Sequence, residues 1–250
     1  MIIIKNSEQL RLMRQAGRIT AEALMVAKEE IRSGMTTKEL DSKIRRYIEK
    51  CGATPTFLGY HGFPGSACIS INDEVIHGIP SDKIIIKEGD IVKVDVGARF
   101  RGYNGDSART FAVGKVSDEA LRLISVTEMS FYEAMKFARA GNRIGDVGSA
   151  VESFVISNGF SVVKAYVGHG VGANLHEEPE VPNFGNAGRG ARLYSGMTLA
   201  IEPMVNAGVA DVKVLKDGWT VTTADGKLSA HYENSIAITE EDPIILTEVS

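Results

Sequence analysis

Cysteine is scarce in this 250-residue chain: Cys51 and Cys68 are the only two, and they form no CxxC motif. A disulfide framework or a thiolate metal site needs more thiols, so the sequence predicts no disulfides and a reducing, cytoplasmic location. Long hydrophobic runs are missing too, since no stretch approaches the roughly 20 apolar residues of a membrane-spanning helix. Residues 1–5 turn polar too early for a secretory signal. We therefore expect no membrane partner.

A surplus of positive charge is also missing, because 28 Lys and Arg residues stand against 32 Asp and Glu residues, for a formal net charge of −4. Nucleic-acid-binding chains normally carry a basic surplus, so the sequence predicts no nucleic acid partner. No Pro- or Ser-rich linker divides the chain, and no heptad run or apolar helix face demands a second copy. We expect one catalytic domain, residues 1–250, acting as a monomer.

What the chain does contain is a set of metal-binding side chains in apolar or Gly-rich stretches, where solvated surface charges would be out of place: Asp95, Asp106, His169, Glu202 and Glu233. Burying an unpaired carboxylate costs several kcal/mol, roughly, so such groups must be paired, protonated or bound to a cation. No matching set of Lys or Arg lies in the same segments. A single such carboxylate is more often a turn or capping group. Together, the five predict a divalent metal site.

The local patterns bring these residues towards one another. Residues 91–97 read as a strand with Asp95 near its end, and a turn at residues 101–105 returns Asp106 to its neighbourhood as a hairpin. Glu202 and Glu233 each lie inside a further apolar run, and His169 lies between glycines that let the backbone pass close to an ion. Four carboxylates offer enough oxygens for two divalent ions if some of them bridge. Oxygen-rich coordination with one imidazole suits Mn, Co or Fe(II), with Zn as a further option.

The two halves of the chain, roughly 1–115 and 116–250, resemble each other at an offset of about 107 to 111 residues. In each half two amphipathic helical patterns precede strand patterns, and Ser7 and Ser117 are the expected N-caps of the first helix of each half. Asp95 and Glu202 occupy equivalent positions. The repeat predicts an α+β fold, in which one curved antiparallel sheet carries helices on its outer face. Two pseudo-symmetric halves would then surround a central metal cleft.

The sequence resembles the type I methionine aminopeptidases of the creatinase/aminopeptidase, or pita-bread, family. The shared motifs run over nearly the whole chain: GYHGFPGS (59–66), ISINDEVIHGIP (69–80), GHGVG (168–172), HEEP (176–179), IEPM (201–204), KDGWT (216–220) and SAHYE (229–233). The resemblance implies two divalent metals on the five ligands, with Asp106 and Glu233 bridging. It also implies removal of the initiator methionine from nascent proteins and peptides with a small second residue, near the ribosome.

The expected reaction is hydrolysis by a water or hydroxide that bridges the metals. Glu202 would carry the proton from this water to the leaving amine. His176 would hydrogen-bond the scissile carbonyl, and His77 would contact the peptide nitrogen or its leaving side, as the resemblance also implies. An unbranched thioether prefers a narrow slot with aromatic walls. The candidate substrate-binding residues are Tyr60, Phe63, Cys68, His77, His176 and Trp219.

Plainer alternatives remain open. The histidines and aromatics can be structural, and His61, which repeats His169 across the halves, is equally a pocket wall or a structural residue. Four positions depart from the family pattern, and we expect none to touch a ligand: Phe57, Phe63, Gly97 and Ala200. The competing functions are an exopeptidase that cuts before proline, whose relatives usually carry an extra N-terminal domain, and a non-catalytic peptide-binding relative.

Overall fold

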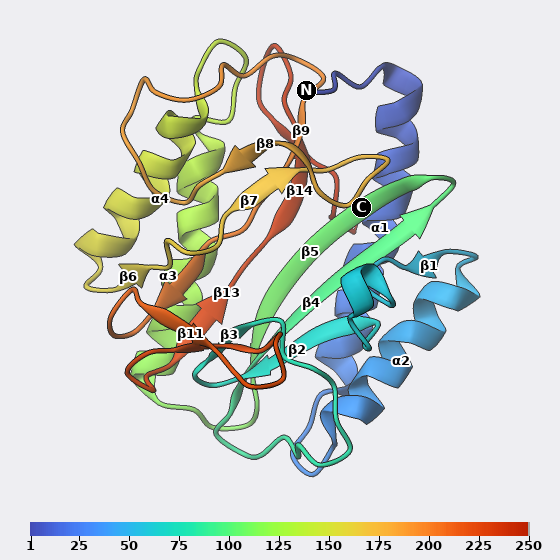
Figure 1. Cartoon of the computed structure of the whole chain (residues 1–250), viewed down its shortest axis with the longest axis vertical. Helices are drawn as coiled ribbons and strands as arrows, with labels where there is room; N and C mark the ends of the chain where they lie inside the picture. Colours follow the sequence, from blue (N-terminus) through green and yellow to red (C-terminus); the bar gives the residue numbers. More distant parts are fainter. Residues whose placement is uncertain (250) are drawn as a thin grey trace.

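The two halves of the molecule follow the same order, with two helices ahead of antiparallel strands (Figure 1). The computed structural model describes residues 1–249. The first half contains α1 (Ser7–Glu30), α2 (Thr37–Lys50), β1 (Thr54–Pro55), the 3-10 helix η1 (Tyr60–Gly62), β2 (Ala67–Ile71), β3 (Glu74–Ile76), β4 (Ile91–Phe100) and β5 (Tyr103–Ala112). The second half begins with α3 (Asp118–Met135) and α4 (Ile144–Ser157). Its strands are β6 (Ser161–Val162), β7 (Gly168–Gly170), β8 (Glu177–Val181), β9 (Thr198–Ile201), β10 (Met204–Asn206), β11 (Val212–Val214), β12 (Val221–Thr223), β13 (Ser229–His231), β14 (Asn234–Ala237) and β15 (Ile244–Ile245).

Side-chain caps explain where the helices begin. The Asn6 side chain accepts the Gln9 N–H, and the Gln9 side chain bonds back to the Asn6 backbone, which is a capping box for α1. The prediction of Ser7 as this cap is therefore wrong by one residue. Thr36 forms the same kind of box before α2, and Ser117 caps α3 as predicted. Each cap satisfies a backbone N–H that the first helical turn leaves unbonded.

Within residues 1–249 the strands form four hydrogen-bonded sheets, and their pairings are antiparallel. The long β4–β5 hairpin closes with a turn at Arg101 and Gly102, whose φ angles are +48° and +86°. Positive φ at both central residues matches the twist of the flanking strands. The backbone hydrogen bonds of the expected single sheet therefore fall into four separate groups of strands. The two halves of the molecule meet along a seam of further hydrogen bonds.

This seam runs antiparallel between β5 and residues 231–235. Ala108 and Glu233 exchange backbone hydrogen bonds directly, with N···O distances of 3.3 and 3.0 Å. On one side, Ser235 Oγ accepts the Asp106 N–H at 3.0 Å and donates to the Asp106 carbonyl at 2.9 Å. On the other side, Thr110 Oγ1 accepts the N–H of His231 in β13 at 2.9 Å and donates to the His231 carbonyl at 2.8 Å. Two hydroxyls therefore continue the pairing where the backbones lie too far apart to bond.

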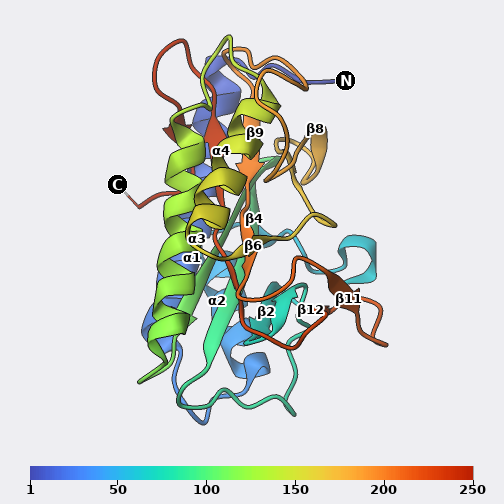
Figure 2. The same cartoon turned by 90° about the vertical axis from the view of Figure 1, so that its left-hand side faces the viewer.

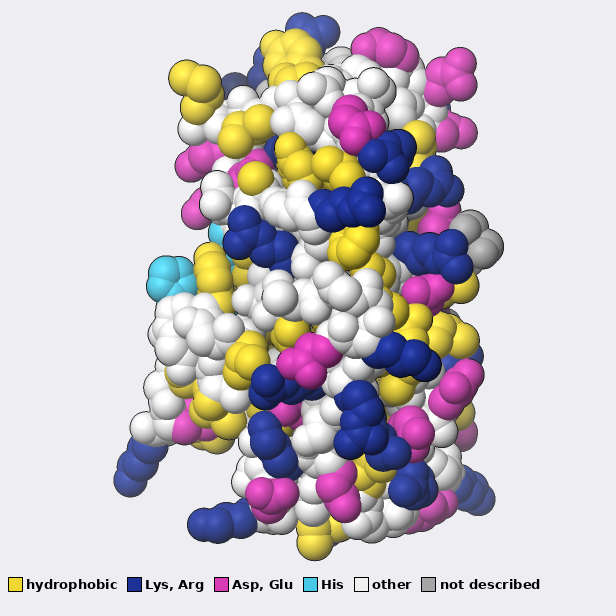
Figure 3. Space-filling model, turned by 90° about the vertical axis from the view of Figure 1, so that its right-hand side faces the viewer, with side chains coloured by type: hydrophobic (Ala, Val, Ile, Leu, Met, Phe, Trp, Pro, Cys, Tyr) yellow, Lys and Arg dark blue, Asp and Glu magenta, His cyan; other side chains and the backbone are white. Residues whose placement is uncertain are grey.

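The helices lie on one side of the strands, and the loops around β8 and β11 project on the other (Figure 2). Separate apolar clusters pack beneath each helix pair, around Leu40 and Ile44 in the first half and around Phe131 and Val151 in the second. On the side where α1 and α2 lie, cationic and anionic side chains are intermingled (Figure 3). Among the described residues, no helix combines the length and apolar character that crossing a membrane requires.

Candidate active site and metal centre

A cavity of about 260 Å³ opens between the halves, and its walls include every residue predicted for ligand, catalytic or substrate-binding roles. Three further residues line it: Phe57, His61 and Leu175. A larger cavity of about 470 Å³ lies between α1 and α3, and among the described residues its lining includes none of the five predicted ligands. The acidic side chains therefore gather in the smaller cavity.

The β4–β5 register explains how Asp95 and Asp106 come together. Asp95 lies opposite Ala108 and Asp106 lies opposite Gly97, so the two carboxylates are diagonal neighbours on one face of the hairpin. The expectation that Asp95 lies near a strand end is wrong, since β4 continues to Phe100. The hairpin is longer than predicted because Gly97 pairs within the ladder instead of ending it.

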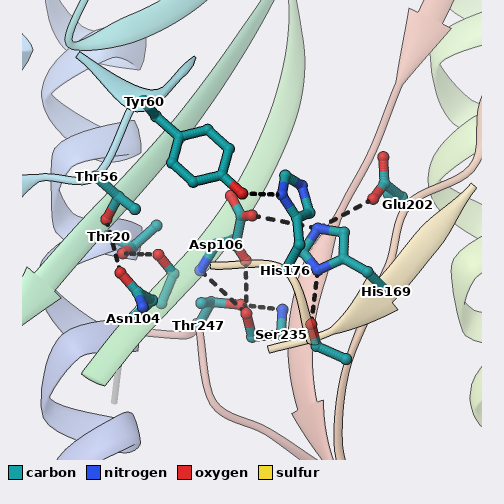
Figure 4. A network of polar contacts seen from close by, with 12 residues as sticks. Thr20, Thr56, Tyr60, Asn104, Asp106, His169, His176, Glu202, Ser235 and Thr247 are labelled. Atoms are coloured by element: carbon teal, nitrogen blue, oxygen red, sulfur yellow. Dashed lines mark hydrogen bonds and ion pairs between the residues drawn. The ribbon is translucent and has the colours of Figure 1, made fainter. Parts of the chain in front are cut away.

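The other three side chains come from the second half. Glu202 directly follows β9 and Glu233 directly precedes β14, and these two strands pair. His169 lies in β7, opposite Ala200 of β9. His169 Nε2 lies 3.7 Å from Asp106 Oδ2 and 3.5 Å from Glu202 Oε1 (Figure 4). Candidate ligand atoms of Asp106, His169 and Glu233 all lie within 4.8 Å of one another.

The His169 ring has a fixed role for each nitrogen. Its Nδ1–H donates to the Gly170 carbonyl at 2.8 Å, which leaves the Nε2 lone pair directed at the acidic cluster. Burial lowers the pKa of His169 to about 3, so the ring is neutral at physiological pH. A neutral imidazole with a free Nε2 is the form that binds a metal.

The carboxylates fit a divalent metal. Burial raises the pKa of Asp106 to about 7, and it raises the pKa of Asp95, Glu202 and Glu233 well above their ordinary values, with repulsion from the neighbouring carboxylates as a further cause. Within residues 1–249, Asp95 Oδ1, Asp106 Oδ1 and Glu233 Oε1 have no hydrogen-bond partner. Buried acceptors of this kind need a partner. A divalent cation supplies it, and carboxylates with one imidazole are a suitable donor set.

Two further histidines border the acidic cluster. His176 lies on the loop between β7 and β8, its Nδ1 is 2.7 Å from the Tyr60 hydroxyl, and its ring lies edge-on to His169 at 4.1 Å. His77 packs edge-on against the rings of Tyr166 and Trp219. Burial lowers the pKa of both histidines, that of His77 to about 4. Both rings are therefore neutral at pH 7.

An apolar slot adjoins the acidic cluster. Its buried members are Phe57, Phe63, Cys68 and Leu175, and Tyr60, Ile79 and Trp219 pack against them. Phe63 meets Trp219 edge-on, with ring centroids 5.2 Å apart. Burial raises the pKa of the Cys68 thiol, so this side chain is a neutral wall. Sequence reasoning missed Leu175, although its position directly before His176 was a usable signal.

Two of the positions expected to depart from the family pattern lie closer than expected to the predicted metal ligands. Gly97 pairs with Asp106 and Ala200 pairs with His169 in the strand registers, so the expectation that neither touches a ligand is wrong. A further histidine lies beside the acidic cluster: the buried His231 Nε2 is 3.9 Å from Glu202 Oε2.

Comparisons with known proteins agree with this geometry. The model of metallopeptidase family M24 matches residues 11–240. A methionine aminopeptidase of Clostridium perfringens is 54% identical over 247 residues, which are 99% of each chain. The crystal structure of methionine aminopeptidase from Thermotoga maritima has a TM-score of 0.98 at 43% identity and is covered completely, as is this chain. The prolidase from Pyrococcus furiosus has a TM-score of 0.80 at 25% identity, but only 66% of that chain is covered. The predicted pita-bread fold is confirmed.

Proposed function

This chain belongs to metallopeptidase family M24, and from that premise we propose that it removes the initiator methionine from nascent proteins and peptides with a small second residue. It is an enzyme of the methionine aminopeptidase type, as its full-length similarity to such enzymes establishes. The observation that carries the proposal is one cavity in which a buried acidic cluster adjoins an apolar slot with aromatic walls. We treat residues 1–250 as a single catalytic domain built by duplication.

The family uses divalent metal, and we propose two ions per chain, which Asp95, Asp106, His169, Glu202 and Glu233 would hold. When bound, the metal supplies Lewis acidity that activates a water molecule and polarises the scissile carbonyl. Oxygen-rich sites accept several divalent ions, so Co, Mn, Fe(II) and Zn are all candidates and cellular availability selects among them.

Glu202 is the proposed proton carrier. Its position between His169 and His231, with a pKa raised well above the ordinary value by burial, supports a carboxylate that takes a proton from the attacking water. The same group would return the proton to the leaving amine.

His176 is the proposed donor to the scissile carbonyl. The neutral ring carries one N–H, and the Tyr60 hydroxyl lies 2.7 Å from Nδ1. If Tyr60 O–H donates to Nδ1, the proton of the ring is on Nε2, and Nε2–H is free for the oxygen on which charge develops. His77 is the proposed contact to the peptide nitrogen, since it lines the cavity beside Trp219.

The apolar slot supports recognition of methionine. Tyr60, Phe63, Cys68 and Trp219 form walls that suit a flexible thioether, and sulfur–aromatic contacts stabilise such a side chain by about 0.3–1.5 kcal/mol each. We further infer that the substrate's free α-amine binds at the acidic cluster, which limits cleavage to chain ends. Nascent chains expose such ends near the ribosome in the cytoplasm, where we propose that the enzyme acts as a monomer.

A peptide panel tests this function. Purified enzyme loaded with Mn or Co is expected to release methionine from Met-Ala-Ser, to leave Ala-Pro peptides intact, and to lose activity with a chelator. Release of alanine from Ala-Pro peptides would favour the X-Pro exopeptidase. Binding of Met-Ala-Ser without turnover, whichever metal is supplied, would favour the non-catalytic relative.

A further inference from the structure

A buried ion pair joins the N-terminal segment to the loop that carries His176. Lys5 Nζ lies 2.5 Å from Glu177 Oε2, and each side chain is only 3% exposed. The lysine is held at both ends, because its backbone N–H donates to the Gly196 carbonyl at 2.8 Å and its Nζ also donates to the Ile3 carbonyl at 3.2 Å. The ammonium group is thus a fixed point and not a mobile surface charge.

The loop is built around the carboxylate of this pair. Glu177 Oε1 accepts the Asn174 N–H at 3.1 Å. A Cβ at position 172 would lie 2.5 Å from Glu177 Oε1 and 2.7 Å from Lys5 Cε, so Gly172 leaves the space that the ion pair fills. The Gly172 carbonyl accepts the side-chain N–H of Asn104 in β5 at 2.9 Å. These contacts fix the loop from three separate segments.

Stability alone does not explain a buried ion pair. The cost of removing two charges from water offsets most of their attraction, and apolar residues of similar volume often serve as well or better. The ion pair is better explained by the single conformation that it imposes on residue 177. This residue is bonded directly to His176.

His176 has few other restraints. It is exposed where it lines the cavity, and its side chain hydrogen-bonds to the Tyr60 hydroxyl. Glu177 is directed towards Lys5 while His176 lines the cavity, as alternation along an extended chain requires. Fixing Glu177 therefore fixes the backbone from which the imidazole reaches the substrate.

We propose that Lys5 is a positioning residue, which acts through Glu177 to hold His176 where it meets the scissile carbonyl. This inference rests on the proposed function of the cavity. Misplacing a reacting group by about 1 Å can lower the rate about 100-fold. Although Lys5 lies far from His176 in the sequence, it thereby controls the rate of the catalytic step and not the affinity for substrate.

The test compares Lys5→Met, Lys5→Arg and the double variant Lys5→Met/Glu177→Met with the wild type. The matched control is Lys164→Met, which removes a surface ion pair with Glu152 on the other half of the molecule. Readouts are kcat and KM on Met-Ala-Ser, the number of metal ions per chain, and the thermal midpoint. We expect Lys5→Met to lower kcat about 10- to 100-fold, with KM within about twofold and metal content unchanged.

Lys5→Arg is expected to retain most of kcat because it keeps the charge, and Lys164→Met is expected to match the wild type. The double variant removes both charges, so it folds without a buried unpaired carboxylate, yet its kcat should remain low. Wild-type kcat in either Lys5→Met or the double variant, with only the thermal midpoint changed, would reduce the pair to a structural role. A wild type that never cleaves Met-Ala-Ser would instead overturn the proposed function.

Discussion

Gly97 and Phe57 share one small volume beside the acidic cluster: a Cβ built on Gly97 would lie 2.8 Å from Phe57 Cε1 and 3.2 Å from its Cδ1. Both positions are among those expected to depart from the family pattern, and in the sequence they lie 40 residues apart. In the structure they are coupled, because the ring of Phe57 occupies the space that a side chain at position 97 would need. Gly97 pairs with Asp106 across the β4–β5 hairpin. The contact between Gly97 and Phe57 therefore places the apolar slot directly against the hairpin that carries Asp106.

Gly97→Ala should therefore push the Phe57 ring into the slot. Overpacking of this kind costs about 1–3 kcal/mol of stability, and we expect KM for Met-Ala-Ser to rise about tenfold, or about 1.4 kcal/mol of binding. Adding Phe57→Cys should restore both values in part, because it removes the ring while Thr56 Cβ stays 2.9 Å from the added methyl group. Chemical denaturation and steady-state kinetics over this double-mutant cycle measure the coupling. Strictly additive effects would show that the two residues do not share a volume.

His176→Ala should lower kcat about 10²- to 10³-fold, since it removes the proposed donor to the developing negative charge. Metal content should stay at the wild-type level, because the ring contacts His169 without being a proposed ligand. Tyr60→Phe should cause a smaller loss, since the ring remains and only its preferred tautomer is released. Kinetics combined with elemental analysis of each protein checks both statements. Loss of metal from His176→Ala would place that residue among the ligands.

Metal binding at pH 7 should release protons. Burial raises the pKa of Asp106 to about 7 and raises the pKa of Asp95, Glu202 and Glu233 well above their ordinary values, so the metal-free protein holds protons that a cation must displace.

The direction in which metal affinity changes with pH follows from the pKa shifts of the imidazole ligand and of the carboxylate ligands. His169, with a pKa of about 3, is already neutral and contributes no proton. Metal affinity should therefore fall as pH drops below 7, because more carboxyl protons must then be displaced. Calorimetry of Mn binding in buffers of different ionisation enthalpy measures the release. A binding enthalpy that is the same in every buffer would contradict it.

Ser235→Ala should destabilise the seam between the halves. The Oγ atom both accepts the Asp106 N–H and donates to the Asp106 carbonyl, so its removal leaves two buried backbone groups unbonded. A buried unsatisfied group costs about 1–3 kcal/mol, and we expect a loss in that range in the metal-free protein. Urea denaturation measures it. Ser157→Ala, on the exposed end of α4, is the control and should stay within about 0.5 kcal/mol of the wild type. Equal stabilities of the two variants would mean that the seam hydroxyl contributes nothing.

Much of the fold could be predicted from local patterns in the sequence. The offset of Asp95 and Glu202 between the halves predicted two copies of one unit, and the turn near residue 102 predicted the hairpin that brings Asp106 diagonally beside Asp95. These features depend on periodicity over a few residues, which a sequence displays directly.

The contacts that local pattern could not supply are long-range and specific to side chains. The seam uses the hydroxyls of Thr110 and Ser235 in place of backbone bonds, and no alternation marks a serine for that role. Lys5 and Glu177 are 172 residues apart, so their pairing appears only when the N-terminal segment is placed. The same holds for Gly97 and Phe57, whose shared volume depends on how β1 and β4 pair.

Anomalous diffraction from crystals soaked in Mn²⁺ tests most directly whether acids from both halves hold a pair of cations. We predict two peaks roughly 3.5–4 Å apart, each bonded to Asp106 and Glu233, with Asp95, His169 and Glu202 completing the coordination. Peaks located elsewhere, or an acidic cluster without Mn at saturating concentration, would contradict the account.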